Sequence, residues 1–216
     1  MRFRLTALAT LASALSFASP AGAQTHFTFV NGGTVSAYGY MVGPYNGVMG
    51  TGAGAQNVKL NCVDFFHEVT AGQQWDANLS NLGTGAGVGT NTRSSSLDLY
   101  RQAAWLSTQY AGKSNADIAA IQATIWNLFA PAPIAGVPSS AYWLAQAQTN
   151  YQKLDYNYFY VVTDVNKTSS SSAQEFLVYS TPEPGTMLLL GTGLAGMAGA
   201  VRRRKQRLGE LPQVEG

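Results

Sequence analysis

The chain has 216 residues, a formal net charge of +2 and only 11% charged residues. Of its 13 Lys and Arg residues, six lie in residues 24–180, and the same range contains eight Asp and Glu residues. This body therefore has no basic patch that would attract nucleic acid, which excludes a nucleic-acid-binding protein. Its length suits one domain with a hydrophobic core of its own.

The N-terminal residues 1–23 predict a secretory signal peptide. Arg2 and Arg4 precede an apolar stretch that ends at residue 17. Small residues at Ala21 and Ala23 then form a cleavage site of the small-x-small kind. The alternative is a retained N-terminal anchor, although the apolar stretch is too short to span a bilayer. We expect export by the Sec machinery and cleavage after Ala23.

Strand-like segments follow in the first half of the body. Branched and aromatic residues bounded by turn residues predict strands over 27–30, 35–42 and 58–69, with turns at 31–33 and 43–47 and glycine-rich loops at 50–55 and 83–89. The third of these strands carries Cys62.

Three helices are predicted next, and they are grouped along the chain. Apolar spacing, serine caps and two terminating prolines predict them over 97–110, 116–129 and about 142–147, and strand character returns over 158–165 and 175–180. Because the helices do not alternate with strands, the pattern predicts an α+β fold. We expect a β-rich barrel or sandwich with a three-helix insertion.

The segment after residue 180 has three ordered parts. A turn of Pro182, Glu183 and Pro184 is followed by an uncharged run over 185–201 and a basic cluster of Arg202, Arg203, Arg204 and Lys205. As a helix the run would cover roughly 25 Å, slightly less than the ~30 Å hydrocarbon core, and flanking arginines can snorkel to close the gap. The positive-inside rule predicts a transmembrane helix with the basic cluster and the polar extension 206–216 in the cytoplasm. The alternatives are an ordinary tail anchor and a core helix, although the glycines of the run make a weak helix for a water-soluble core.

The ordered Pro-Glu-Pro motif, apolar stretch and arginine-rich end over 181–205 resemble the PEP-CTERM sorting signal of Gram-negative bacteria. The resemblance implies recognition by an exosortase, a membrane cysteine peptidase that cuts near the motif. It also implies that the protein is exported, is anchored transiently in the inner membrane, and then reaches the cell surface or the extracellular space. The polar extension departs from the usual pattern, which stops soon after the basic cluster.

Two residues of the body, Cys62 and Gln122, have side chains that could react. Cys62 is the only cysteine, so it cannot form an internal disulfide. Gln122 falls inside an apolar helix face between Ile118 and Ile125, where an unpaired amide would cost on the order of 1–3 kcal/mol. The glutamine is therefore either hydrogen-bonded in the core or has reacted. The thiol is either buried and inert, used between molecules, or consumed by other chemistry.

The segments Asn-Cys-Val-Asp at 61–64 and Ile-Gln-Ala-Thr-Ile-Trp at 121–126 resemble the thioester domains of bacterial surface adhesins. The resemblance implies an internal thioester between Cys62 and Gln122, although Ile121 stands where that family often has threonine. Trp126, Trp105 and Phe129 would keep water away. An amine on another surface or matrix component would then bond covalently to Gln122 and free the thiol. This is adhesion in a single turnover, so we expect no enzyme activity.

Other chemistries are less well matched by the sequence. A Cys–His site would need a histidine beside Cys62, and His67 would point to the opposite face of an unbulged strand, which leaves only His26. The His-Glu and Asp-Glu pairs are too few for a zinc or calcium site, so we expect no metal and no cofactor. The alternative function is a non-reactive structural or binding protein of the biofilm or exopolysaccharide matrix, with Cys62 buried as a free thiol.

Overall fold

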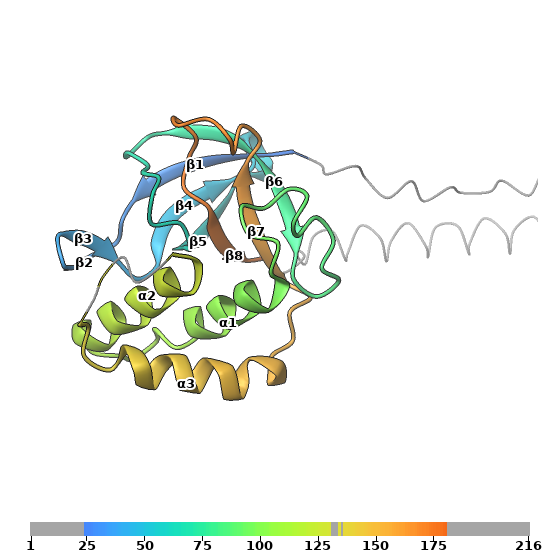
Figure 1. The fold of residues 1–216 in the computed structure, drawn as a ribbon. Coiled ribbons are helices and arrows are strands. Elements are labelled where there is room, and N and C mark those ends of the chain that lie inside the picture. Colours follow the sequence, from blue (N-terminus) through green and yellow to red (C-terminus); the bar gives the residue numbers. More distant parts are fainter. Residues whose placement is uncertain (1–23, 131–133, 135, 181–216) are drawn as a thin grey trace, which may run out of the picture.

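The computed structural model describes residues 24–130, 134 and 136–180 (Figure 1). Within them six strands close into an antiparallel barrel, and three helices gather at one end of it. The predicted α+β class is confirmed, with a barrel in place of a sandwich. The predicted signal peptide, with Ala21 and Ala23, lies outside the described residues. The predicted membrane helix, with the motif 182–184 and the basic cluster 202–205, lies outside them too.

The barrel strands are ordered β1-β4-β5-β8-β7-β6, and every neighbouring pair is antiparallel. Their bounds are β1 (Thr25–Asn31), β4 (Tyr45–Met49), β5 (Gln56–Cys62), β6 (Gln74–Asn81), β7 (Phe159–Asp164) and β8 (Phe176–Tyr179). β1 also pairs with β6, the strand at the other end of the order. This pairing closes the barrel, so neither β1 nor β6 presents an open edge.

Residues 35–42 form a small hairpin beside the barrel instead of the single strand predicted for them. Its strands are β2 (Val35–Ala37) and β3 (Tyr40–Val42), joined by Tyr38 and Gly39. Both turn residues have positive φ angles, 57° and 85°. Positive φ at both central residues is typical of a type I′ turn, whose twist matches that of the paired strands. Glycine at position 39 adopts this conformation without strain.

Two barrel strands, β4 and β6, are missing from the predicted pattern. β4 covers residues that look like a turn because they include Gly47. β6 alternates exposed and buried residues at its start but contains no β-branched residue. The predicted strand over 58–69 is too long, because β5 ends at Cys62. There the Asp64 carboxylate accepts a hydrogen bond from the Phe66 backbone nitrogen at 3.0 Å and turns the chain.

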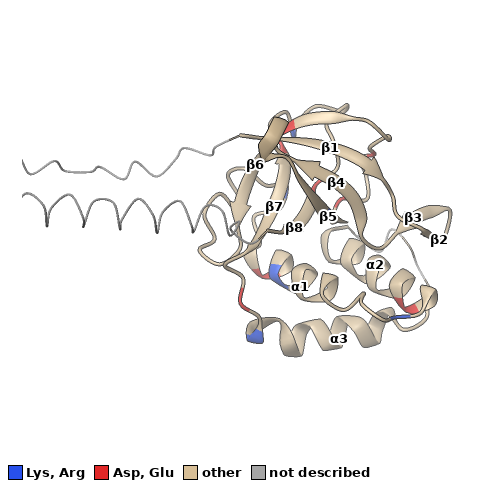
Figure 2. Cartoon of the chain, turned by 180° about the vertical axis from the view of Figure 1, so that it is seen from behind, with Lys and Arg blue, Asp and Glu red and all other residues tan. Residues whose placement is uncertain are grey.

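The helices follow one another along the chain, as predicted, and lie between β6 and β7 in the sequence. They are α1 (Leu97–Ser107), α2 (Asn115–Phe129) and α3 (Ser140–Asn150), and two short 3-10 helices cover Gly52–Gly54 and Tyr151–Lys153. The Ser96 and Ser114 hydroxyls cap α1 and α2 by accepting backbone hydrogen bonds from Leu99 and Asp117. All three helices pack on one another at the same end of the barrel, as both views show (Figures 1 and 2).

Helix α2 joins the two parts of the core. One cluster of buried side chains fills the barrel and includes Cys62 and Trp126, whereas the other lies among the helices and includes Ile121 and Ile125. Every residue of α2 from 119 to 126 is buried. This middle part of α2 therefore has no solvent face, and the glutamine within it has only protein groups around it.

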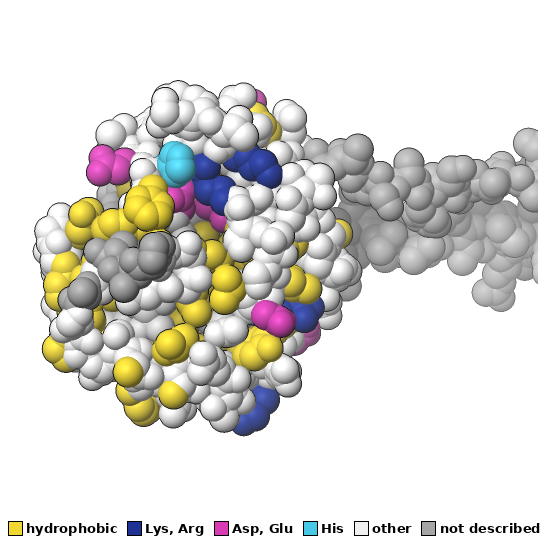
Figure 3. Space-filling view, viewed as in Figure 1, with side chains coloured by type: hydrophobic (Ala, Val, Ile, Leu, Met, Phe, Trp, Pro, Cys, Tyr) yellow, Lys and Arg dark blue, Asp and Glu magenta, His cyan; other side chains and the backbone are white. Residues whose placement is uncertain are grey.

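The surface carries few charges, and both signs are mixed. Figure 2 shows short stretches of Lys, Arg, Asp and Glu separated by long uncharged segments. On the face shown in Figure 3, most exposed atoms belong to uncharged polar groups, backbone or apolar side chains.

Gly47→Ala should destabilise the barrel by roughly 1–3 kcal/mol, because overpacking of a close contact is costly. A Cβ atom at Gly47 would lie 2.5 Å from Leu60 Cδ1 and 3.2 Å from the Thr28 backbone oxygen. Leu60 is completely buried, so its side chain cannot shift without disturbing the core around it. Chemical unfolding followed by tryptophan fluorescence measures the change. Gly54→Ala is the matched control, since nothing lies within 4 Å of its Cβ, and equal effects of the two variants would refute the packing argument.

Candidate functional site

The two residues predicted to react meet in a cluster of buried side chains at the contact between α2 and β5, although 59 residues separate them in the sequence. Cys62 is the last residue of β5, and it pairs with Phe176 of β8. Gln122 lies in the middle of α2, which packs against β5. Both residues are 0% exposed. The position of α2 across the end of the barrel therefore brings the glutamine to the cysteine.

A direct hydrogen bond links the two residues. Gln122 Nε2 donates to the backbone carbonyl of Cys62 at 2.8 Å. The other end of the same carboxamide, Oε1, accepts a hydrogen bond from the Tyr110 hydroxyl at 2.8 Å. The amide is therefore fixed in orientation at both ends and meets the requirement that a buried polar group be paired. Tyr110 is a site residue that the sequence did not reveal, since the sequence pattern made it only the last residue of the helix predicted over 97–110.

The thiol of Cys62 has two hydrogen-bond partners of its own. Cys62 Sγ donates to the Asp64 backbone carbonyl at 3.1 Å, and the Trp126 indole nitrogen donates to Sγ at 3.4 Å. Burial raises the pKa of the Cys62 thiol from 9.0 to about 12, and the hydrogen bond from Trp126 opposes this rise only in part. The free thiol is therefore protonated at neutral pH.

Aromatic rings cover the thiol on the side of Trp126. The Trp126 ring meets Phe65 and Tyr40 edge to face, with centroid distances of 5.2 and 5.9 Å. Of the three aromatic residues predicted to keep water away, Trp126 is the one that contacts the thiol. The other two predicted shields lie elsewhere: Phe129 packs on Tyr100 at 4.9 Å, and Trp105 is half-buried on α1.

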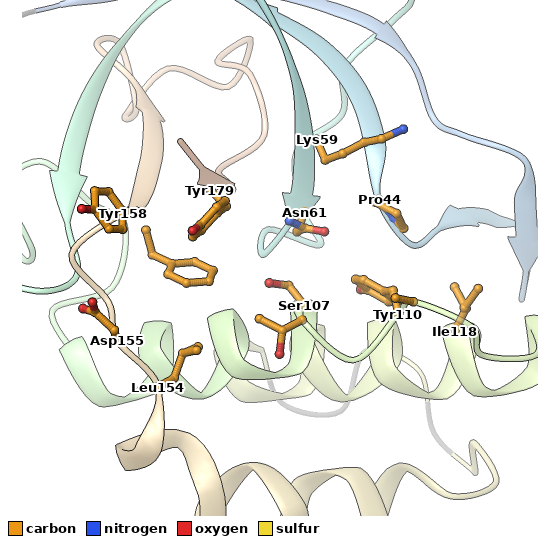
Figure 4. A pocket seen from close by; sticks show the side chains of 13 residues that line it. Pro44, Lys59, Asn61, Ser107, Tyr110, Ile118, Leu154, Asp155, Tyr158 and Tyr179 are labelled. Carbon is orange, nitrogen blue, oxygen red and sulfur yellow. The ribbon is translucent and has the colours of Figure 1, made fainter. Parts of the chain in front are cut away.

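Two cavities approach this cluster from different directions. The larger, of about 690 Å³, lies between the barrel wall and α1, and Tyr110 and Ile118 line one end of it (Figure 4). Leu154 and Asp155 line the other end, and the amine of Lys59 points away from the cavity (Figure 4). The smaller cavity, of about 250 Å³, is lined by Trp126, Tyr40 and Phe65 among others. Tyr110 and Trp126 therefore separate the Cys62–Gln122 pair from the two cavities.

Neither histidine belongs to this cluster. His67 Nδ1 lies 2.8 Å from Asp64 Oδ2, and Arg93 Nε lies 2.9 Å from the same oxygen. His67 is not on a strand, contrary to prediction, because β5 has already ended. His26 Nδ1 pairs with Asp76 Oδ1 at 3.0 Å, where β1 and β6 lie side by side on the barrel. The described structure thus places both histidines beside carboxylates.

A buried carboxylate, Glu175, stands next to this ion-paired group. Its Oε1 accepts hydrogen bonds from the Arg93 backbone nitrogen and the Thr163 hydroxyl, at 2.8 and 2.7 Å. Its Oε2 accepts one from the Tyr100 hydroxyl at 2.5 Å. Burial raises the pKa of the Glu175 carboxyl, and these hydrogen bonds together with the Arg93 charge oppose the rise. These hydrogen bonds link Glu175, the residue before β8, to Thr163 of β7 and Tyr100 of α1.

Glu175→Gln tests the electrostatic cost of this carboxylate. A carboxyl whose pKa is raised by folding stabilises the fold while protonated, and this contribution is lost as the pH rises through the folded-state pKa. The unfolding free energy of the wild type, relative to Glu175→Gln, should therefore fall as the pH rises from below 4.5, the ordinary pKa of the group. Urea unfolding at a series of pH values measures this difference. Glu68→Gln, at an exposed position, is the control; a difference that grows with pH would contradict the burial argument.

The described residues hold neither a candidate metal site nor a candidate membrane span. They contain no group of three or more His, Cys, Asp or Glu residues that could hold a metal ion. None of the helices in this part of the chain is long and apolar enough to cross a membrane. The predicted membrane helix over 185–201 lies outside that part and remains a prediction.

Comparison with known proteins identifies the C-terminal segment. Residues 180–205 match the PEP-CTERM protein-sorting motif, which confirms the sorting segment predicted over 181–205. No curated protein and no solved structure matches the chain. The resemblance of the body to adhesin thioester domains therefore has no support from these comparisons. The chain carries the sorting motif of PEP-CTERM proteins, and this motif supports an exported protein that is processed by an exosortase.

Proposed function

We propose that the exported body forms an internal thioester between Cys62 and Gln122 and uses it to bond covalently to amines. The observation that carries this proposal is the 2.8 Å hydrogen bond from Gln122 Nε2 to the Cys62 backbone carbonyl. It holds a carboxamide beside the only thiol of the chain, in a site that excludes water. Approach and orientation of this kind account for a large share of the rate of intramolecular reactions.

The first step would consume both side chains. Cys62 Sγ attacks Gln122 Cδ, the C–S bond forms and the C–N bond breaks. The thiol proton moves to the departing nitrogen, which leaves as ammonia. Because the free thiol is protonated at neutral pH, this proton has to leave sulfur as the new bond forms.

The second step would join the protein to its target. A primary amine, such as a lysine side chain on a surface or matrix component, attacks Cδ of the thioester. A new C–N bond forms, the C–S bond breaks, and a proton from the amine returns to sulfur. The product is a stable amide at Gln122 and a free Cys62 thiol, so each molecule reacts once.

A second candidate function is a non-reactive structural or binding protein of the extracellular matrix. Two observations favour it. The Gln122 carboxamide is fully paired as an intact amide, and the Cys62 thiol has a raised pKa of about 12. A glutamine and a cysteine that only fill the core would have the same surroundings.

The mass of the folded protein distinguishes the two functions. If the thioester forms, the wild type will be lighter than its sequence by one ammonia, and methylamine will add once to Gln122. Cys62→Ala and Gln122→Ala should lose both the mass deficit and the adduct. Gln148→Ala, at an exposed glutamine of α3, should keep both. Intact-mass spectrometry with peptide mapping makes the measurement.

An undiminished mass would refute the thioester. In that case the Cys62 thiol should react with iodoacetamide as soon as the protein is unfolded, and the matrix protein would be the function that remains.

The sorting segment would direct the body out of the cell in two stages. Sec export places the body outside, and the apolar run over 185–201 anchors it transiently in the inner membrane, with the basic cluster in the cytoplasm. Exosortase then cuts near the motif, and the body passes to the cell surface or the extracellular space.

Changing Pro182 and Glu183 to alanine should block this processing, because the rigid turn that precedes the apolar run is lost. Most of the protein should then remain uncleaved in the membrane fraction of cells that contain an exosortase. Immunoblotting of membrane and secreted fractions measures this. Pro212→Ala, in the polar extension, is the control and should be processed normally. Equal cleavage of the double variant would mean that another feature is recognised.

A further inference from the structure

Each of the three reacting atoms in the Cys62–Gln122 pair has its own hydrogen-bond partner. The Tyr110 hydroxyl donates to the amide oxygen, and the Trp126 indole donates to the sulfur. The amide nitrogen donates to the Cys62 backbone carbonyl. In the Gln122 carboxamide, the oxygen therefore accepts a hydrogen bond and the nitrogen donates one.

We infer that Tyr110 is the catalytic hydrogen-bond donor that activates the Gln122 carbonyl, both for closure of the thioester and for its later reaction with an amine. This inference rests on the thioester proposed above. It assigns a chemical role to a residue that otherwise only satisfies a buried amide.

Charge develops at the oxygen that Tyr110 contacts. When a nucleophile adds to the Gln122 carbonyl carbon, Oε1 becomes an oxyanion. A donor already in place 2.8 Å from that oxygen stabilises the oxyanion without reorganisation, and it does so most strongly where water is excluded. Tyr110 is 6% exposed and Gln122 is 0% exposed, so water does not replace the hydroxyl in this role.

Tyr110 remains a donor throughout both steps. Burial raises the pKa of its hydroxyl well above 10.0, so the phenol keeps its proton at neutral pH. The proton that reaches the leaving ammonia therefore comes from the thiol. The Cys62 carbonyl accepts a hydrogen bond from the nitrogen that gains this proton, and stabilises the positive charge that develops there.

The Trp126 indole is placed to stabilise the charge that develops on the sulfur. As the thioester reacts with an amine, the sulfur leaves with negative charge, and the Trp126 indole N–H lies 3.4 Å from it. Tyr110 acts on the oxygen and Trp126 on the sulfur. Removing the tyrosine hydroxyl should therefore slow both steps, because the oxyanion forms in both.

Tyr110→Phe removes the hydroxyl and keeps the ring, which also lines the larger cavity beside Ile118 (Figure 4). In the full chain, this variant should acquire the ammonia deficit more slowly than the wild type. Its reaction with methylamine should be slower by on the order of 100-fold, the usual effect of losing one oxyanion donor. Time-resolved intact-mass spectrometry at several methylamine concentrations measures both rates.

Tyr45→Phe is the matched control. Tyr45 is also buried, and its hydroxyl donates to the Met41 backbone carbonyl at 2.7 Å and not to Gln122. It should lose some stability but react at the wild-type rate. A purely structural role for Tyr110 would give the same result in both variants, namely a change in unfolding free energy with no change in rate.

The outcomes separate this inference from the proposal beneath it. A wild type without the ammonia deficit refutes the thioester itself. A wild type with the deficit, together with a Tyr110→Phe variant that reacts equally fast, refutes only the role of Tyr110. If Tyr110→Phe does not fold, 3-fluorotyrosine placed at position 110 keeps the hydroxyl and makes it a stronger donor. Aminolysis should then be roughly two- to five-fold faster, and an unchanged rate would overturn the inference.

Discussion

The contact between α2 and the end of β5 determines the rest of this structure. The hydrogen bond from Gln122 to the Cys62 carbonyl joins the buried middle of α2 to the last residue of a barrel strand. Apolar packing brings the two elements together, and the polar pair fixes how far α2 slides and rotates against the barrel. A single buried amide does this effectively, because any other register would leave its nitrogen and oxygen without partners.

Within the described residues, this pair is the only place where a thiol and a carboxamide meet. The thiol, the carboxamide, a phenol and an indole meet in a site with no exposed cysteine or glutamine atoms. Paired amides are common in protein cores, and a sulfur beside an indole is also ordinary. In the proposed thioester reaction, each atom whose charge would change already has a hydrogen-bond partner of the right polarity.

Local sequence patterns predicted the fold class because the helices have strong signals. Serine caps and apolar spacing marked α1 and α2, and the grouped order of elements indicated an α+β protein. The closure of the barrel could not be predicted from the sequence, because two of the six strands are unusual. β4 contains Gly47, and β6 has few typical strand residues. Gln122 could be recognised from its place in an apolar face. Tyr110 could not, since it follows the end of α1 and its partner depends on how two helices pack.

The barrel also determines how the body would respond to a pull on its tail. The last described strand, β8, leads toward the sorting motif and is hydrogen-bonded to β5 on one side and β7 on the other. In antiparallel pairs these bonds lie across the strand, so tension along the chain acts on all of them in parallel as shear. Cys62 is paired with Phe176 at the far end of that strand. A mechanical path from residue 180 to the buried thiol therefore crosses only one strand pairing, the one between β8 and β5.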